Sequence, residues 1–213
     1  REVSDVVEHG LMIEGLAPTD RLRLYRCLTI TTLLLGSLDR SLEVARAEVE
    51  LARALGDEHA LVFALRDLGN ALMCHRGDEV GAVEAFEESR VLAASIGDAR
   101  GEAAAVLNLG AVANDAGRWD EGLRLARDAG RLSLPLGDWE SVTYSYVNQA
   151  VALWKLGSGG DPRPLVEKAA RIAVEHEWVE GQATALELLA ALSIGLTAWH
   201  HAGRLGGADP TAA

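Results

Sequence analysis

The residues of this chain that could do catalytic chemistry do not stand at the spacings that catalysis needs. Cys74 and His75 are a thiol and an imidazole, but neighbours in a helix point about 100° apart and cannot form a nucleophile–base pair. The same angle excludes His200 and His201 as a helical metal pair. The glycine-rich segment 157–161 has no lysine, which a phosphate-binding loop requires. We therefore expect no enzyme activity, no metal and no cofactor.

Composition favours an all-helical chain with an acidic surface. The 213 residues are dominated by Ala, Leu, Glu and Arg, aromatic residues make up 5%, and β-branched residues do not gather into alternating runs. The 20 Lys and Arg residues against 32 Asp and Glu residues give a formal net charge of -12, and no basic stripe interrupts the sequence. Such a surface repels nucleic-acid phosphates and anionic lipid headgroups. We expect neither direct nucleic-acid binding nor membrane association.

The cysteines and the apolar segments favour a cytoplasmic location. Cys27 and Cys74 lie in apolar helical surroundings without Cys-x-x-Cys spacing, a pattern that predicts buried, reduced thiols. The longest apolar stretch, residues 28–38, contains Thr, Gly and Ser and is too short to cross a bilayer. No signal peptide is visible, so the sequence predicts a cytoplasmic protein.

A repeat of about 40 residues organises most of the chain. Its clearest anchors are Leu55-Gly56-Asp57, Ile96-Gly97-Asp98 and Leu136-Gly137-Asp138. Between the anchors, apolar residues recur at helical spacing, and a second glycine break, such as Gly117 or Gly157, divides each period into two helices. Repeats of this length bury their apolar faces only by stacking on their neighbours. The pattern predicts a stack of antiparallel helix hairpins.

Two segments resemble the signature of tetratricopeptide (TPR) repeats. They are Leu68-Gly69 with Leu72, Gly77, Ala82 and Phe86, and Leu109-Gly110 with Ala113, Gly117, Gly122 and Ala126. The resemblance implies an all-α, right-handed superhelical solenoid of about five antiparallel hairpins. In that family the glycine of the Leu-Gly pair lets helices pack closely, and the later Ala and Phe positions fill the hairpin interior. The period of about 40 is similar to that of a long-helix TPR variant found in large regulators.

A narrower resemblance suggests a larger parent protein. The Arg- and Ala-rich repeats, followed by residues 202–208, look like the C-terminal arms of actinobacterial LuxR-type or SARP-type signal-transduction ATPase regulators. Those regulators carry an NTPase module and a DNA-binding domain elsewhere in the polypeptide. We interpret residues 1–17 as the second helix of a truncated repeat, 18–196 as the TPR-like array, and 197–213 as a degenerate final helix and flexible tail.

The TPR resemblance also implies a concave groove lined by the first helix of each hairpin. Asn108 and Asn148 are one repeat apart and are expected at equivalent heights, with Asn70 one turn away in the preceding repeat. An amide offers both a donor and an acceptor, so a ladder of amides can pair with the backbone of an extended peptide. Arg66, Asn70 and Asn108 match part of a TPR carboxylate clamp. Its remaining basic positions are here Tyr144 and Asn148, which argues against a complete clamp.

These considerations define a candidate site and two functions. The predicted peptide- or partner-binding residues are Arg66, Asn70, Asn108, Tyr144, Asn148 and Trp154. The alternative for the asparagines is that they bond to neighbouring helices and brace the stack, and the alternative for the aromatic residues is packing. The first predicted function is binding of a protein or peptide as the sensor or regulatory arm of a larger bacterial transcriptional regulator. The second is an intramolecular scaffold that autoinhibits an attached NTPase or DNA-binding domain without an external ligand.

Overall fold

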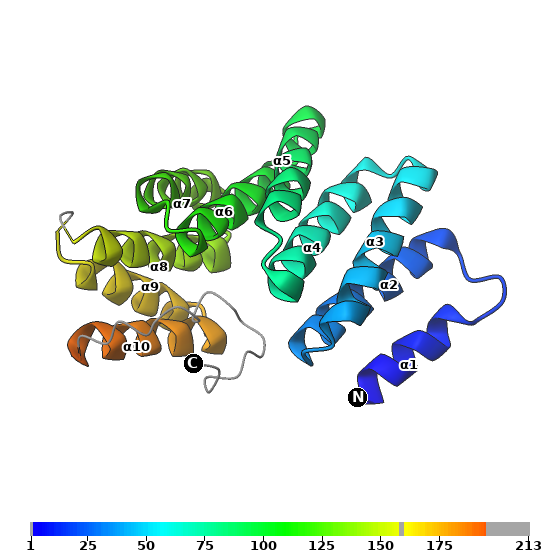
Figure 1. Ribbon diagram of the computed structural model, residues 1–213, viewed down its shortest axis with the longest axis horizontal. Helices are drawn as coiled ribbons and strands as arrows, with labels where there is room; N and C mark the ends of the chain where they lie inside the picture. The colour runs from blue at the N-terminus through cyan, green and yellow to red at the C-terminus, as the bar shows by residue number, and fades with distance from the viewer. Residues whose placement is uncertain (1, 158–159, 195–213) are drawn as a thin grey trace. The chain divides into compact units, whose positions relative to one another are not determined.

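The computed structural model describes residues 2–157 and 160–194, which form ten α-helices and one 3-10 helix without any strand (Figure 1). The elements are α1 (Glu2–Leu11), α2 (Pro18–Leu34), α3 (Leu38–Leu55), α4 (Glu58–Arg76), α5 (Glu79–Ile96), α6 (Ala99–Asp115), α7 (Trp119–Ser133), η1 (Leu134–Leu136), α8 (Trp139–Leu156), α9 (Arg163–Glu175) and α10 (Val179–Ile194). Helices α2 to α8 contain 15 to 19 residues each, which accounts for the long repeat. Within this described part, no helix is both long and apolar enough to cross a membrane.

The Gly-Asp pairs of the repeat end one helix and begin the next. Gly97 follows α5 with a φ of 72°, a left-handed conformation that residues with a side chain rarely adopt. The carboxylate of Asp98 then accepts a hydrogen bond of 2.9 Å from the backbone N–H of Gly101 and caps α6. Gly137, with a φ of 62°, and Asp138 do the same before α8. Local sequence therefore sets these helix boundaries, as predicted.

The chain divides into two compact units, here called the N-terminal unit (described residues 2–97) and the C-terminal unit (described residues 98–157 and 160–194). Within each unit, every helix packs against the next one along the chain. First helices of successive hairpins also touch: α2 contacts α4, α6 contacts α8, and α8 contacts α10. The predicted all-α stack of antiparallel hairpins is thus confirmed, while the handedness of a superhelix stays a prediction.

The glycines of both Leu-Gly pairs lie at close helix crossings. A Cβ added to Gly69 would lie 2.5 Å from Cε1 of Phe86, whose buried ring fills the space between α4 and α5. A Cβ added to Gly110 would lie 3.2 Å from the backbone nitrogen of Ala126 in α7. The prediction of close packing at the two glycines is therefore confirmed, and Phe86 fills the hairpin interior as the TPR resemblance implied.

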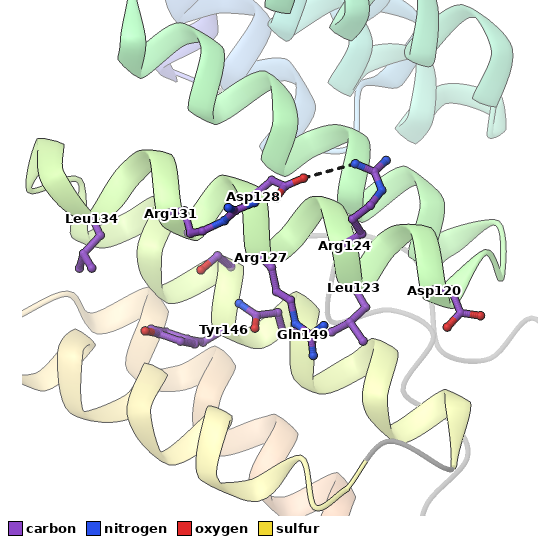
Figure 2. Close-up of a pocket in the computed structure, with 11 residues that line it drawn as sticks. Asp120, Leu123, Arg124, Arg127, Asp128, Arg131, Leu134, Tyr146 and Gln149 are labelled. Carbon is purple, nitrogen blue, oxygen red and sulfur yellow. Dashed lines mark hydrogen bonds and ion pairs between the residues drawn. The ribbon is translucent and has the colours of Figure 1, made fainter.

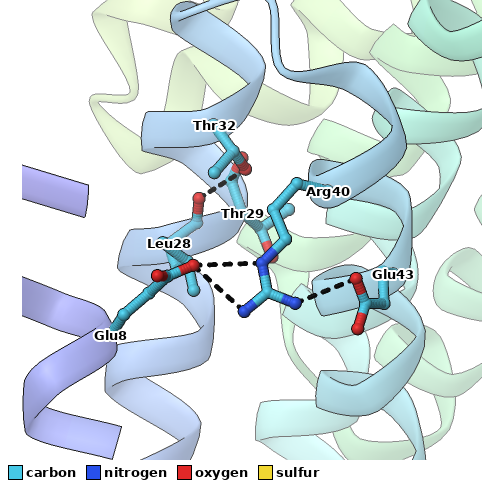
Figure 3. A network of polar contacts seen from close by, with 6 residues as sticks. All are labelled: Glu8, Leu28, Thr29, Thr32, Arg40 and Glu43. Carbon is cyan, nitrogen blue, oxygen red and sulfur yellow. Dashed lines mark hydrogen bonds and ion pairs between the residues drawn. The ribbon is translucent and has the colours of Figure 1, made fainter. Parts of the chain in front are cut away.

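Arg40 ties α1 to α3 in the N-terminal unit (Figure 3). Its Nε donates to Oε1 of Glu8 at 3.1 Å, and its Nη1 pairs with Oε2 of Glu43 at 2.9 Å. Hydrogen bonding to Glu43 and Glu8, opposed by partial burial, raises the pKa of the Arg40 guanidinium. On α2 beside it, the buried hydroxyl of Thr32 donates to the carbonyl oxygen of Leu28 at 2.6 Å, so this polar group is satisfied within its own helix.

The prediction of two buried thiols is wrong. Neither cysteine forms a disulfide, Cys27 is exposed, and Cys74 is only partly buried. Helix α2 carries apolar residues around its whole circumference, including the exposed Ile30 and Leu34, so periodicity does not show which face is buried. Cys27 falls on the outward side, next to the fully buried Leu28.

The predicted domain ends are only partly covered by the structure. Helix α1 ends at Leu11, where the N–H of Met12 donates to the carbonyl of His9 at 3.1 Å, and residues 12–17 are not helical. The predicted degenerate helix and tail at 197–213 lie outside the described residues. The boundaries at residues 17 and 196 remain predictions.

Candidate partner-binding surface

The predicted binding residues divide between the two units. Arg66 and Asn70 lie on α4 in the N-terminal unit, and Asn108 lies on α6 in the C-terminal unit. Tyr144, Asn148 and Trp154 lie on α8, which packs against α6. All six side chains are partly buried, as expected for residues at the edge of a helix stack that still reach solvent.

A different asparagine braces α6 against α8. Asn114, at 5% exposed, donates from Nδ2 to the backbone carbonyl oxygen of Asn148 at 3.1 Å. The side chains of Asn70, Asn108 and Asn148 make no hydrogen bond to any other described residue. The helix-to-helix bond therefore uses the main chain of Asn148 and leaves its amide group available.

Tyr144 stands one turn before Asn148 on α8 and lies against an aromatic neighbour from the next hairpin. Its ring meets Trp178, just before α10, edge to face, with ring centroids 5.1 Å apart and planes at 74°. Burial, aided by the carboxylates of Glu180 and Glu140, raises the pKa of the Tyr144 hydroxyl. This group therefore stays protonated at neutral pH and can donate a hydrogen bond.

Trp154 does not share this position. It follows Asn148 by six residues, which places it about 120° around the helix axis from that amide. The ammonium group of Lys155 lies 5.2 Å from the centre of the Trp154 ring and 5.9 Å from that of Trp119. The indole thus belongs to a cation–π group near the end of α8 rather than to the Asn108–Asn148 surface.

In the N-terminal unit, Arg66 takes part in a stack around an aromatic ring. The guanidinium carbons of Arg26 on α2 and Arg66 on α4 lie 4.2 and 5.2 Å from the centre of the Phe63 ring. Arg26 Nε also lies 3.8 Å from Oδ2 of Asp67, a carboxylate at 6% exposed. The positive charges of Arg66 and Arg26 both stabilise the ionised form of Asp67, a carboxylate of the protein itself.

A second buried carboxylate, that of Glu48, interacts with the charges of Asp67, Arg26 and Arg66. Glu48 on α3 is 3% exposed, and burial, with a contribution from the negative charge of Asp67, raises its pKa to about 8. Burial also raises the pKa of Asp67, against the opposing effect of Arg66 and Arg26. Because Arg66 compensates internal charge, it is poorly suited to clamp the carboxylate of a ligand.

Comparison with known proteins defines the fold. No protein-family model matches the sequence, and no curated protein matches it either. A solved STAND protein (signal transduction ATPase with numerous domains) from Pyrococcus horikoshii, which has a tetratricopeptide repeat sensor, matches with a TM-score of 0.65 at 15% identity. The fold is TPR-like. The match covers 80% of this chain and 26% of the STAND protein, so the chain spans about a quarter of that protein's length.

Two further solved structures match this TPR-like chain. BtubC (BKLC) of P. vanneervenii has a TM-score of 0.65 at 14% identity, covering 82% of this chain and 71% of its own. A Rap protein complexed with Competence and Sporulation Factor has a TM-score of 0.58 at 15% identity, covering 90% of this chain and 56% of its own. At such low identities, these likenesses establish the fold alone.

Some residues that shape the surface were not among the predicted ones. Asn114 stands six residues after Asn108, and only the contact with α8 distinguishes the bracing asparagine from the free one. Trp178 occupies the place of a Gly-Asp turn, and its indole lies over Gly181, where any Cβ would collide with the ring. The sequence signal for this residue was a tryptophan at a position where the preceding repeats carry an aspartate.

Proposed function

We propose that this chain is a protein- or peptide-binding TPR-like module whose contact surface includes Asn108, Tyr144 and Asn148. The observation that carries the proposal is that only one of three asparagine side chains on α6 and α8 is used in the contact between these helices. Asn114 makes the bond between these helices, while the amides of Asn108 and Asn148 reach solvent with their donors and acceptors unused by the described residues. Free amides and a tyrosine hydroxyl carried by two helices in contact suit the main chain of an extended segment.

The fold neighbours support this proposal. One contains a tetratricopeptide repeat sensor within a signal transduction ATPase, and another was solved with a bound factor. By analogy, we propose that the chain is the sensor or regulatory arm of a larger cytoplasmic regulator, with the LuxR-type or SARP-type transcription factors as the specific candidates. The proposal gives the chain no catalytic role.

A peptide selection tests the proposal directly. The purified chain is used to select binders from a library of random peptides, and the affinities of enriched peptides are then measured by isothermal titration calorimetry. The double variant Asn108→Ala with Asn148→Ala loses two hydrogen bonds to the peptide main chain. Its affinity for the enriched peptides should therefore be about five- to a hundred-fold lower. Arg171→Ala, an exposed change on α9, is the matched control and should leave the affinities unchanged.

Two outcomes would contradict the proposed surface. One is a set of peptides that binds the double variant as tightly as the original chain. The other is a selection that yields no specific peptide, which would favour the alternative of an intramolecular scaffold that autoinhibits an attached domain.

A further inference from the structure

A cavity lies between α7 and α8 in the C-terminal unit (Figure 2). Its volume is about 570 Å³, within the range of small-ligand pockets. Arginines of α7 line one side, and Ser145, Tyr146 and Gln149 of α8 line the other. Gln149 follows Asn148 by one residue and so points about 100° away from the proposed peptide surface.

At two positions, α7 carries the opposite charge to the equivalent helix one repeat earlier. Arg124 and Arg127 stand 40 residues after Glu84 and Glu87 of α5. Together with Arg131, this gives α7 three arginines, which all line the cavity. Because the two helices are second helices of successive hairpins, their packing alone does not require this reversal.

One arginine in the cavity is left without an acidic partner. Asp128 pairs with Arg124 at 3.3 Å and also with Arg131, so its carboxylate is already shared by two guanidinium groups. Arg127 makes no ion pair or hydrogen bond to any described residue. Figure 2 shows its side chain extending from α7 towards Gln149 on α8. The free positive charge thus points into the cavity.

The side-chain amide of Gln149 on α8 lines the cavity opposite Arg127. Gln149 is 9% exposed, and its side chain makes no hydrogen bond to another described residue. The equivalent position in the two preceding repeats is a leucine, Leu68 and Leu109. An amide at a position where the preceding repeats carry leucine offers a donor and an acceptor to a group that enters the cavity. This is the second, independent indication of a ligand.

We propose that this cavity binds a carboxylate group, held by the guanidinium of Arg127 and the side-chain amide of Gln149. A guanidinium presents parallel N–H donors that match the two oxygens of a carboxylate, and the amide supplies a further donor. Asp120 and Asp128 also line the cavity, and the carboxylate of Asp128 is paired with Arg124 and Arg131. Leu123 and Leu134 provide contact for a short aliphatic segment next to the charged group.

Titration with glutarate tests this site, with glutaramide as the uncharged control. Side-chain Nε–Hε signals of arginine in ¹H–¹⁵N NMR spectra should show saturable glutarate binding that perturbs Arg127, and no saturable binding of glutaramide. A blocked Glu-Ala-Glu peptide, titrated in parallel, shows whether the carboxylate is held better on a peptide than on a small molecule. Tighter binding of either probe than of glutaramide fits the proposal.

Three variants separate a specific site from general attraction. Arg127→Gln should lower the affinity for glutarate at least about tenfold, because a charge-assisted hydrogen-bonded pair is lost. Gln149→Leu should lower the affinity for glutarate less. It should keep or raise the melting temperature, since the two preceding repeats carry leucine at this position. Arg171→Gln on α9 makes the same change in net charge outside the cavity and should have little effect. Absence of saturable binding, or equal weakening by Arg127→Gln and Arg171→Gln, would overturn the proposal.

Discussion

The two units place different residues at equivalent positions of their hairpins. In the N-terminal unit, Gly69 faces the large buried ring of Phe86, whereas in the C-terminal unit Gly110 faces the backbone of α7 at Ala126. Asp67 is buried under arginines, and Asn108, one repeat later, is partly exposed with a free amide. At this position the N-terminal unit therefore carries a buried carboxylate next to its own arginines, whereas the C-terminal unit carries an amide that no described residue binds.

The largest expected effect on stability comes from the crossing of α4 and α5, which the ring of Phe86 fills. Phe86 is 1% exposed, and Phe86→Ala would leave a cavity between α4 and α5. We expect the free energy of unfolding to fall by about 3 to 5 kcal/mol, measured by urea denaturation. Val91→Ala on the same helix, at an exposed position, is the control and should change stability by less than about 0.5 kcal/mol. A loss below about 1 kcal/mol for Phe86→Ala would show that the ring does not support the crossing.

The next effect concerns the glycine opposite this ring. Gly69→Ala adds a Cβ that collides with Phe86, and the cost of overpacking, about 1 to 3 kcal/mol, exceeds the gain of about 1 kcal/mol in helix propensity. The melting temperature should therefore fall. Combining Gly69→Ala with Phe86→Leu should recover part of this loss relative to the sum of the single changes, because the smaller side chain makes room. A Gly69→Ala variant at least as stable as the parent would contradict the crossing geometry.

The fold follows from sequence because its determinants are local. Gly97 with Asp98 and Gly137 with Asp138 end and cap helices through backbone conformation and short-range hydrogen bonds, so their spacing predicts the boundaries. The glycine crossings were predictable for the same reason, through the TPR signature at Leu68-Gly69 and Leu109-Gly110.

The polar interior and the candidate sites depend on contacts between helices, which the repeat pattern does not encode. Glu48 reads as a surface residue of a charged helix, yet it is buried between α3 and its neighbours. Asn114 and Asn108 are equally polar, but only Asn114 meets the main chain of α8. The sequence could therefore predict candidate amides, and could not show which amide braces the fold.

The buried carboxylates make the stability of the N-terminal unit depend on pH. Because the pKa of Glu48 rises from an ordinary value of 4.5 to about 8 in the folded chain, stability is greatest below the ordinary value and decreases as pH rises towards 8. Glu48→Gln mimics the protonated group, so it should raise the free energy of unfolding by about 1 to 2 kcal/mol at pH 7 and have little effect at pH 4. Some pH dependence should remain because the pKa of Asp67 is raised as well. Chemical denaturation across this pH range provides the measurement, and a Glu48→Gln variant that is less stable at pH 7 would show that Glu48 is ionised and paired.

We propose that different asparagines of the C-terminal unit brace the helices and bind a partner. Urea denaturation of Asn114→Ala and of Asn108→Ala with Asn148→Ala, compared side by side, tests it most directly. Loss of the Asn114–Asn148 hydrogen bond should cost about 0.5 to 1.5 kcal/mol, whereas the double change removes only free amides and should cost less than about 0.5 kcal/mol. A double variant destabilised as much as Asn114→Ala would show that Asn108 and Asn148 support the helix stack, and would contradict the assignment of their amides to a partner.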